Sequence, residues 1–142
     1  MKRLLKVIFS LGTAVLVGGC GGGPEIVPVS GKVTIDGQPL TKGVIQVIAE
    51  GYRPAMGDIQ ADGSFQLTTD KPNDGCVRGT HKVAIIGDET LGPASRKWHA
   101  PPDYADFTKS GLTLTVEKPT KDARFELSWK GGKPYVEKFN KE

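Results

Sequence analysis

The sequence predicts an all-β fold, and more specifically a seven-stranded β-sandwich with Greek-key connections. Apolar and polar residues alternate in short runs beyond residue 26, as in strands with one buried face, and no stretch shows the i, i+3, i+4, i+7 spacing of an amphipathic helix. Asp-Gly pairs, which favour tight turns, follow or interrupt these runs. The 142 residues include 19 glycines and 10 prolines, a composition typical of one turn-rich domain.

The first run is Val29 to Ile35, and Asp36-Gly37 after it predicts a turn. Residues 58–69 are predicted to form a hairpin around Asp62-Gly63, with Phe65 and Leu67 facing inward. The predicted strands are residues 29–35, 44–49, the two arms of the hairpin 58–69, and residues 80–86, 112–116 and 123–129.

Residues 87–110 form a long connection with three prolines and no clear strand pattern. We expect it to cover one end of the sandwich, because a loop of this length is usually functional or disordered and this one carries several aromatic residues. Trp98, Tyr104 and Phe107 are therefore candidates either for a partner-binding surface or for simple packing on the core. The polar tail, residues 131–142, is expected to fray.

The N-terminus predicts an export signal. Lys2, Arg3 and Lys6 precede an uncharged, mostly apolar run at residues 7–17, which is too short for the roughly 20 residues of a membrane span. Without residues 1–19 the chain has 16 basic and 16 acidic residues. A neutral domain without a basic block excludes nucleic acid as an expected partner.

Val17, Gly18, Gly19 and Cys20 resemble the lipobox of bacterial lipoproteins, with an aliphatic residue three positions before the cysteine and small residues between. The resemblance implies cleavage between Gly19 and Cys20, a diacylglyceryl group on the Cys20 thiol, and a new amino group that is available for acylation with a palmitate-type chain. Two or three acyl chains hold a protein stably on a membrane. Residues 20–26 would then be the lipidated cysteine and its flexible tether. The alternative is a plain secretory signal with an incidental cysteine.

Five segments in order resemble one family. Residues 29–40, 61–69, 71–75, 79–85 and 101–116 are similar to small lipoproteins, abundant in planctomycete-type bacteria, that carry a transthyretin-like or carboxypeptidase regulatory-like domain. The resemblance implies a prealbumin-like sandwich over residues 27–130, with no enzymatic activity and with the covalent lipid on Cys20 in place of a cofactor. It implies a cell-envelope protein on the cell membrane or outer membrane, facing the periplasm or the exterior. Its partner would be an unidentified envelope protein or carbohydrate.

Two residues depart from the family pattern, namely Cys76 after the segment 71–75 and His81 within the segment 79–85. Cys76 is interpreted as a buried thiol, an intermolecular disulfide or a reactive nucleophile. His81 shares a strand face with Val83 and Ile85, which favours a hydrogen-bonded histidine at the edge of the core. A periplasmic hydrolase that uses Cys76 and His81 is the alternative function.

A metal-binding protein is the other alternative. His81, His99, Met56 and Cys76 are the candidate copper or zinc ligands, but no pair has ligand spacing such as H-x-x-x-H or C-x-x-C, so no metal site is predicted. The aspartates around residues 70–74 lack the dense order of a calcium loop.

Overall fold

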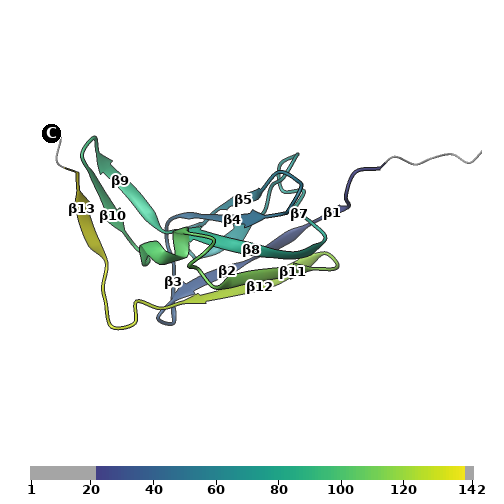
Figure 1. Cartoon of the computed structure of the whole chain (residues 1–142). Helices are drawn as coiled ribbons and strands as arrows, with labels where there is room; N and C mark the ends of the chain where they lie inside the picture. Colours follow the sequence, from purple (N-terminus) through teal and green to yellow (C-terminus); the bar gives the residue numbers. More distant parts are fainter. Residues whose placement is uncertain (1–21, 140–142) are drawn as a thin grey trace, which may run out of the picture.

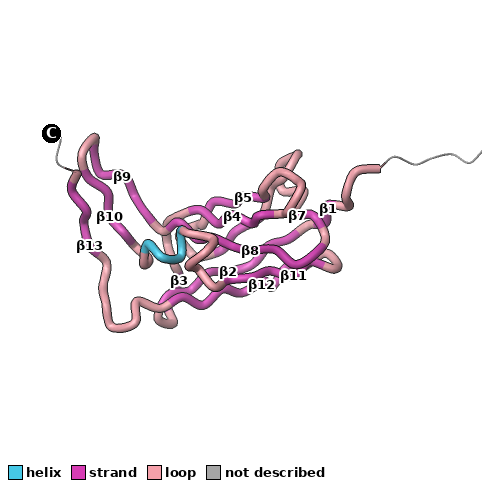
Figure 2. Tube along the Cα trace, in the orientation of Figure 1, coloured by secondary structure: helices cyan, strands magenta, loops and turns pink. Residues whose placement is uncertain are grey.

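A computed structural model describes residues 22–139 (Figures 1 and 2). This part of the chain contains thirteen strands, one short 3-10 helix and no α-helix, which confirms the all-β prediction. None of its helical segments is long and apolar enough to cross a membrane. The predicted signal peptide, Gly19 and Cys20 lie outside the described residues.

The first sheet is built around β2 (Val29–Ile35). Strand β12 (Thr120–Leu127) pairs with it in parallel on one side, while β3 (Gln38–Pro39) and β6 (Ser64–Gln66) pair antiparallel with it. The predicted turn at Asp36-Gly37 is present, with φ angles of 48° and 80° at the two residues. Positive φ at both central residues is the geometry that Asp-Gly favours in tight hairpins.

The second sheet is antiparallel throughout, in the order β11 (Leu112–Val116), β8 (Gly79–Ile86), β4 (Val44–Ile48) and β5 (Ala55–Asp58). The predicted turn before Ser64 is also present, because Gln60 N–H donates to the Ser64 carbonyl at 2.8 Å. Its first arm is β5, which ends at Asp58 instead of beginning there. The two arms belong to different sheets, and a single pairing of Met56 with Thr68 joins them. The other six predicted strands also lie in these two sheets. The short strand β3 was not predicted, so the two sheets contain eight strands instead of the seven expected.

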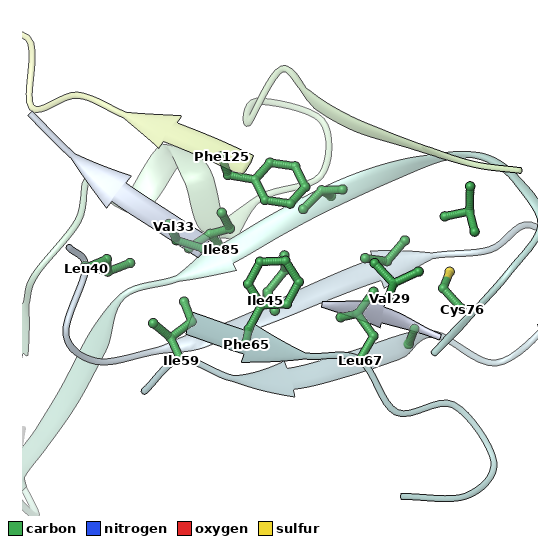
Figure 3. Close-up of a cluster of buried hydrophobic side chains, with 14 of the residues drawn as sticks. Val29, Val33, Leu40, Ile45, Ile59, Phe65, Leu67, Cys76, Ile85 and Phe125 are labelled. Atoms are coloured by element: carbon green, nitrogen blue, oxygen red, sulfur yellow. The ribbon is translucent and has the colours of Figure 1, made fainter. Parts of the chain in front are cut away.

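The core lies between the two sheets (Figure 3). Val33, Phe65 and Phe125 come from the first sheet, and Ile45 and Ile85 come from the second. The Phe65 and Phe125 rings are 6.1 Å apart at a tilt of 42°, a favourable geometry for an aromatic pair. Each such side chain contributes about 1.5–3 kcal/mol when it is fully buried, so alternation along these strands determines which face becomes the core.

The expectation that residues 87–110 form a loop without strands is wrong. The segment contains the hairpin of β9 (Asp88–Gly92) and β10 (Ser95–Trp98), followed by the 3-10 helix Pro102–Ala105. The expectation of a frayed tail is also wrong for the strand β13 (Tyr135–Lys138), which pairs with β10. We call the sheet β13-β10-β9 the distal sheet. Its strands are largely polar, so no apolar alternation marked them in the sequence.

The distal sheet lies at the opposite end of the molecule from the N-terminal strand β1 (Ile26–Val27), as Figure 1 shows. Strand β1 pairs with β7 (Cys76–Val77), which immediately precedes β8. Strand β8 runs along the sandwich for eight residues, or about 26 Å, and β9 begins two residues after β8 ends. The polypeptide therefore enters the domain at one end and forms the distal sheet at the other.

Candidate functional site

Most of the exposed large hydrophobic side chains of the described chain lie on or beside the distal sheet. Five large hydrophobic side chains between residues 22 and 139 are exposed, and four of them belong to this sheet or adjoin it: Leu91, Tyr135, Val136 and Phe139, at 41–52% exposure. The fifth is Met56, on strand β5. Single exposed hydrophobic residues are normal, but four of them on and beside one small sheet, on both of its faces, make this sheet a candidate interaction site.

Arg96 holds the distal sheet together. Its guanidinium lies 5.3 Å from the centre of the Trp98 ring and 4.7 Å from that of Phe139, both within cation–π range. It also lies 3.4 Å from the carboxylate of Asp88 on β9 and 3.4 Å from that of Glu137 on β13. One side chain therefore links all three strands of the sheet.

The distal sheet is fixed to the sandwich at its base. Trp98 is only 7% exposed, and its indole N–H donates to the Glu137 carboxylate at 2.9 Å. His99 N–H donates to the Gly87 carbonyl at 2.7 Å. Hydrogen bonds from Lys42 and His99 to the Glu89 carboxylate lower the pKa of Glu89, so this carboxylate is ionised at neutral pH. The base of the sheet is therefore joined to the sandwich by the backbone hydrogen bond to Gly87 and by the Lys42–Glu89 ion pair.

The charged side chains of the distal sheet that have no ion-pair partner in the described chain are lysines. Asp88, Glu89 and Glu137 each have a cationic partner within the protein. Lys97 on β10 and Lys138 on β13 form no ion pair in the described part of the chain. A partner of this surface therefore meets lysines and apolar side chains.

The predicted partner residues Trp98, Tyr104 and Phe107 do not form one exposed patch. Trp98 is buried at the base of the distal sheet. Tyr104 packs against the core, and its hydroxyl oxygen accepts the Ser128 N–H at 3.1 Å. Phe107 is half-buried. Two of the three aromatic side chains thus serve packing, and a role for them in partner binding stays a prediction.

Sequence reasoning missed the exposed residues of the distal sheet. Residues 135–139, with the sequence Tyr-Val-Glu-Lys-Phe, have high β-propensity at their first two positions and an aromatic residue at each end. That short signal could have identified β13. The strand pattern is obscured because β13 follows two glycines, at positions 131 and 132, and is flanked by polar residues.

Cys76 is fully buried beside Val29 at one end of the core (Figure 3). Burial raises the pKa of its thiol to about 11. The thiol is therefore protonated at neutral pH, whereas a nucleophile requires the thiolate. A sulfur atom with no exposed surface is also not available for a disulfide with a second chain.

His81 is the hydrogen-bonded histidine that the strand pattern indicated. Its Nε2 lies 2.7 Å from the Val77 carbonyl oxygen, which can only accept, so Nε2 carries the proton and donates. His99 adjoins Gly87, beyond the opposite end of β8, about 20 Å away along the strand. No hydrogen bond in residues 22–139 joins Cys76 to a histidine, so the predicted pairing of Cys76 with His81 is not formed in this structure.

The aspartates around residue 74 have partners within the protein. The Asp74 carboxylate accepts the backbone N–H groups of Thr69, Asp70 and Lys71 at 2.7, 3.0 and 2.9 Å. Burial opposes its ionisation, but these donors outweigh burial and lower its pKa. Asp70 accepts a hydrogen bond from Tyr52 at 2.7 Å. Within residues 22–139, no group of three or more histidine, cysteine, aspartate or glutamate side chains could hold a metal ion.

A second surface feature is a shallow hollow of about 640 Å³ along strands β2, β5 and β6. It is lined mainly by polar side chains, including Ser30, Lys32, Gln66, Asn73 and Lys121. No buried polar side chain in the described residues lacks a hydrogen-bond partner, so none there is left for a ligand to satisfy. The distal sheet, with its exposed apolar side chains and lysines, is the better candidate site.

Comparison with known proteins found no matching family model, no matching curated protein and no matching solved structure. The class of protein therefore rests on the geometry of the chain itself. Residues 22–139 form an all-β domain in which two four-stranded sheets enclose one core. The β1-β7 pair lies at one end, and the partly apolar distal sheet lies at the other.

Proposed function

We propose that the chain is an extracytoplasmic lipoprotein whose transthyretin-like β-sandwich, with Greek-key connections, is a non-catalytic binding or structural module. A lipid on Cys20 holds it on the cell membrane or outer membrane, with the domain facing the periplasm or the exterior. The sequence Val17-Gly18-Gly19-Cys20 carries this proposal, since it follows a charged and then apolar leader.

The position at which the domain begins supports the anchor. The Glu25 carbonyl accepts the Arg78 N–H at 3.0 Å, and the Glu25 carboxylate pairs with the Arg78 guanidinium at 2.8 Å. Glu25 is therefore fixed to the domain, and it lies five residues after Cys20, a stretch that spans at most about 17 Å when extended. A lipid on Cys20 would hold the β1 end of the sandwich close to the membrane surface.

The arrangement of the strands supports the module. In the second sheet β4 lies beside β8, although about 30 residues separate them in the sequence, and in the first sheet β12 lies beside β2. These long-range pairings agree with a Greek-key sandwich of the prealbumin type. A binding role agrees with the exposed apolar residues and lysines of the distal sheet.

The test is detergent-phase partition of the protein expressed in its host with its own leader. We expect the wild type in the detergent phase and Cys20→Ser in the aqueous phase, because an acyl chain contributes about 0.8 kcal/mol per buried methylene. Cys76→Ser is the matched control, and it should stay in the detergent phase. Equal partition of the wild type and Cys20→Ser would contradict the anchor.

A further inference from the structure

We propose that strand β13 of the distal sheet accepts an extended protein segment in which acidic and apolar residues alternate, and that this segment pairs with the free edge of β13 as a fourth strand. The inference rests on the proposed role of the domain as a binding module and names the class of its partner. Addition of a strand to a sheet edge is a common mode of peptide recognition, in which main-chain hydrogen bonds give affinity and side chains give specificity.

The backbone of β13 supplies the first argument. Phe139 N–H donates to the Ala94 carbonyl at 2.7 Å, beyond the last residue of β13 on the side of β10. Backbone groups point alternately to the two sides of a strand, so Glu137 and Tyr135 also point toward β10. The N–H and C=O groups of Val136 and Lys138 therefore point away from β10. No other strand in the described chain pairs with that edge.

The side chains of β13 define the two faces that a fourth strand would extend. Lys97 lies opposite Val136 in the β10–β13 pairing, and Lys138 lies two residues beyond Val136, so both lysines share one face. Tyr135 and Phe139 lie on the other face. A segment with acidic residues on the lysine face and apolar residues on the aromatic face complements both, and such a segment alternates acidic and apolar residues along its length.

Charge favours this partner over a second copy of the same chain. The acidic side chains of the distal sheet already pair with Arg96, Lys42 or His99. Two copies paired through β13 would bring Lys138 of each chain to one shared edge. The carboxylate of β13, on Glu137, lies on the other face of the strand and 3.4 Å from Arg96, so it does not balance these lysines. Like charges across a strand pair are destabilising, whereas opposite charges stabilise it.

The location of the sheet agrees with capture of a partner. Strand β1, which follows the tether, lies at the opposite end of the sandwich (Figure 1). A domain held by residue 20 therefore presents β13 on the end away from the anchor. The unpaired N–H and C=O groups of a sheet edge are a template for pairing with another chain, and the edge of β13 offers such groups to a partner.

The test uses the purified full-length protein and three fluorescently labelled peptides of equal length. One peptide alternates glutamate and valine, one alternates lysine and valine, and one is the glutamate–valine peptide with N-methyl groups along one backbone edge. We expect the glutamate–valine peptide to bind about tenfold or more tightly than the lysine–valine peptide in anisotropy titrations, and less tightly as salt increases. The N-methylated peptide should not bind.

Two pairs of variants locate the site. Val136→Pro removes one outward N–H donor without removing a bond to β10, because proline is tolerated on an edge strand when its nitrogen faces solvent. It should abolish binding, while Val136→Thr should retain it. Lys97→Glu combined with Lys138→Glu should reverse the preference between the peptides. Lys82→Glu combined with Lys118→Glu makes the same change of charge outside the distal sheet and should leave the preference unchanged.

Three results would overturn the inference. The first is the absence of binding by every peptide, and the second is equal binding by the wild type and Val136→Pro. The third is binding of phosphatidylglycerol vesicles, but not of the peptides, through Lys97 and Lys138, which would assign the surface to an anionic membrane. All these measurements are made in solution and do not depend on the lipid. Their failure would leave the partition result for Cys20 intact, so the two proposals can fail separately.

Discussion

Replacement of Arg96 by alanine removes the side chain that connects the three strands of the distal sheet. The variant loses the contacts of the guanidinium with the Trp98 and Phe139 rings and its ion pairs with Asp88 and Glu137. None of these residues belongs to the hydrophobic core of the sandwich. The effect should therefore appear as local opening of the distal sheet rather than as unfolding of the whole domain.

The magnitude follows from the exposure of the groups. A cation–π contact at an exposed site is worth about 0.5–1 kcal/mol, and a surface ion pair about 0.2–1 kcal/mol. The Arg96 and Glu137 side chains are 35% and 42% exposed, so solvent screens their attraction and the lower part of the second range applies. Two contacts of each kind give a loss of about 2 kcal/mol, which corresponds to about a thirtyfold change in an opening equilibrium.

Amide hydrogen exchange measures this opening directly. The amide protons of Glu137 and Phe139 point toward β10, so they should exchange about thirtyfold faster in Arg96→Ala than in the wild type. The amide protons of β4 and β8, in the centre of the second sheet, should keep their rates. Arg96→Lys keeps the charge but not the flat guanidinium, so it should give an intermediate rate.

Arg124→Ala is the matched control, because Arg124 is an exposed arginine on β12 that forms no ion pair in the described chain. It should not change exchange in the distal sheet. Unchanged exchange at Glu137 and Phe139 in Arg96→Ala would refute the view that Arg96 holds the sheet. Equal acceleration in β8 would refute its local character.

Three further predictions concern the sandwich. Cys76 should react with a thiol reagent at neutral pH only after denaturation, as measured by mass spectrometry, because the thiol is buried and its pKa is raised to about 11. Asp74→Ala should lower the free energy of unfolding by about 1–3 kcal/mol at pH 7, since three backbone donors lose their acceptor. The pKa of Asp74 is lowered in the folded state, so the ionised carboxylate stabilises the fold above the unfolded pKa of 3.8, and this stabilisation is lost as the pH falls below that value. Urea titrations should therefore show a smaller loss of unfolding free energy for Asp74→Ala at pH 3 than at pH 7. Gly31→Ala should destabilise the domain by about 1–3 kcal/mol, because its new methyl group would overlap the Ala123 carbonyl in the neighbouring strand.

Each of these three predictions has a control. Denatured protein gives the full reactivity of Cys76. Asp122→Ala replaces an exposed aspartate on β12 and should change the free energy of unfolding by less than about 0.5 kcal/mol. Gly92→Ala places its methyl group no closer than 3.9 Å to Ser95 and should be tolerated. A deficit for Asp74→Ala that is equal at pH 7 and pH 3, or tolerance of Gly31→Ala, would contradict the respective argument.

The sandwich was predictable because its strands bury one face. Val33, Phe65 and Leu67 alternate with polar residues, and the pattern identifies both the strand and the face. The Asp36-Gly37 turn was predictable from the local preference of these residues for positive φ. The parallel pairing of β12 with β2 was not predictable, because it joins segments about 90 residues apart and leaves no local signal.

The distal sheet escaped sequence reasoning for a different reason. Its strands are held by Arg96 and Glu89, whose partners lie far away in the sequence, such as Phe139 for Arg96 and Lys42 for Glu89. A pattern of apolar residues predicts which side chains are buried, but it does not predict ion pairs between segments that are distant in the sequence. The sequence marks Trp98 as a candidate for partner binding. In the structure its side chain is buried at the base of the distal sheet and donates a hydrogen bond to Glu137.

The most direct measurement of the central claim is the mass of the N-terminal peptide of the mature protein, released by protease from membranes of cells that express the full chain. The account predicts a peptide that begins at Cys20 and carries a diacylglyceryl group through a thioether. The same peptide from Cys20→Ser should lack the lipid. A peptide from wild-type protein that contains residues before Cys20, or one that begins at Cys20 without lipid, would contradict the account.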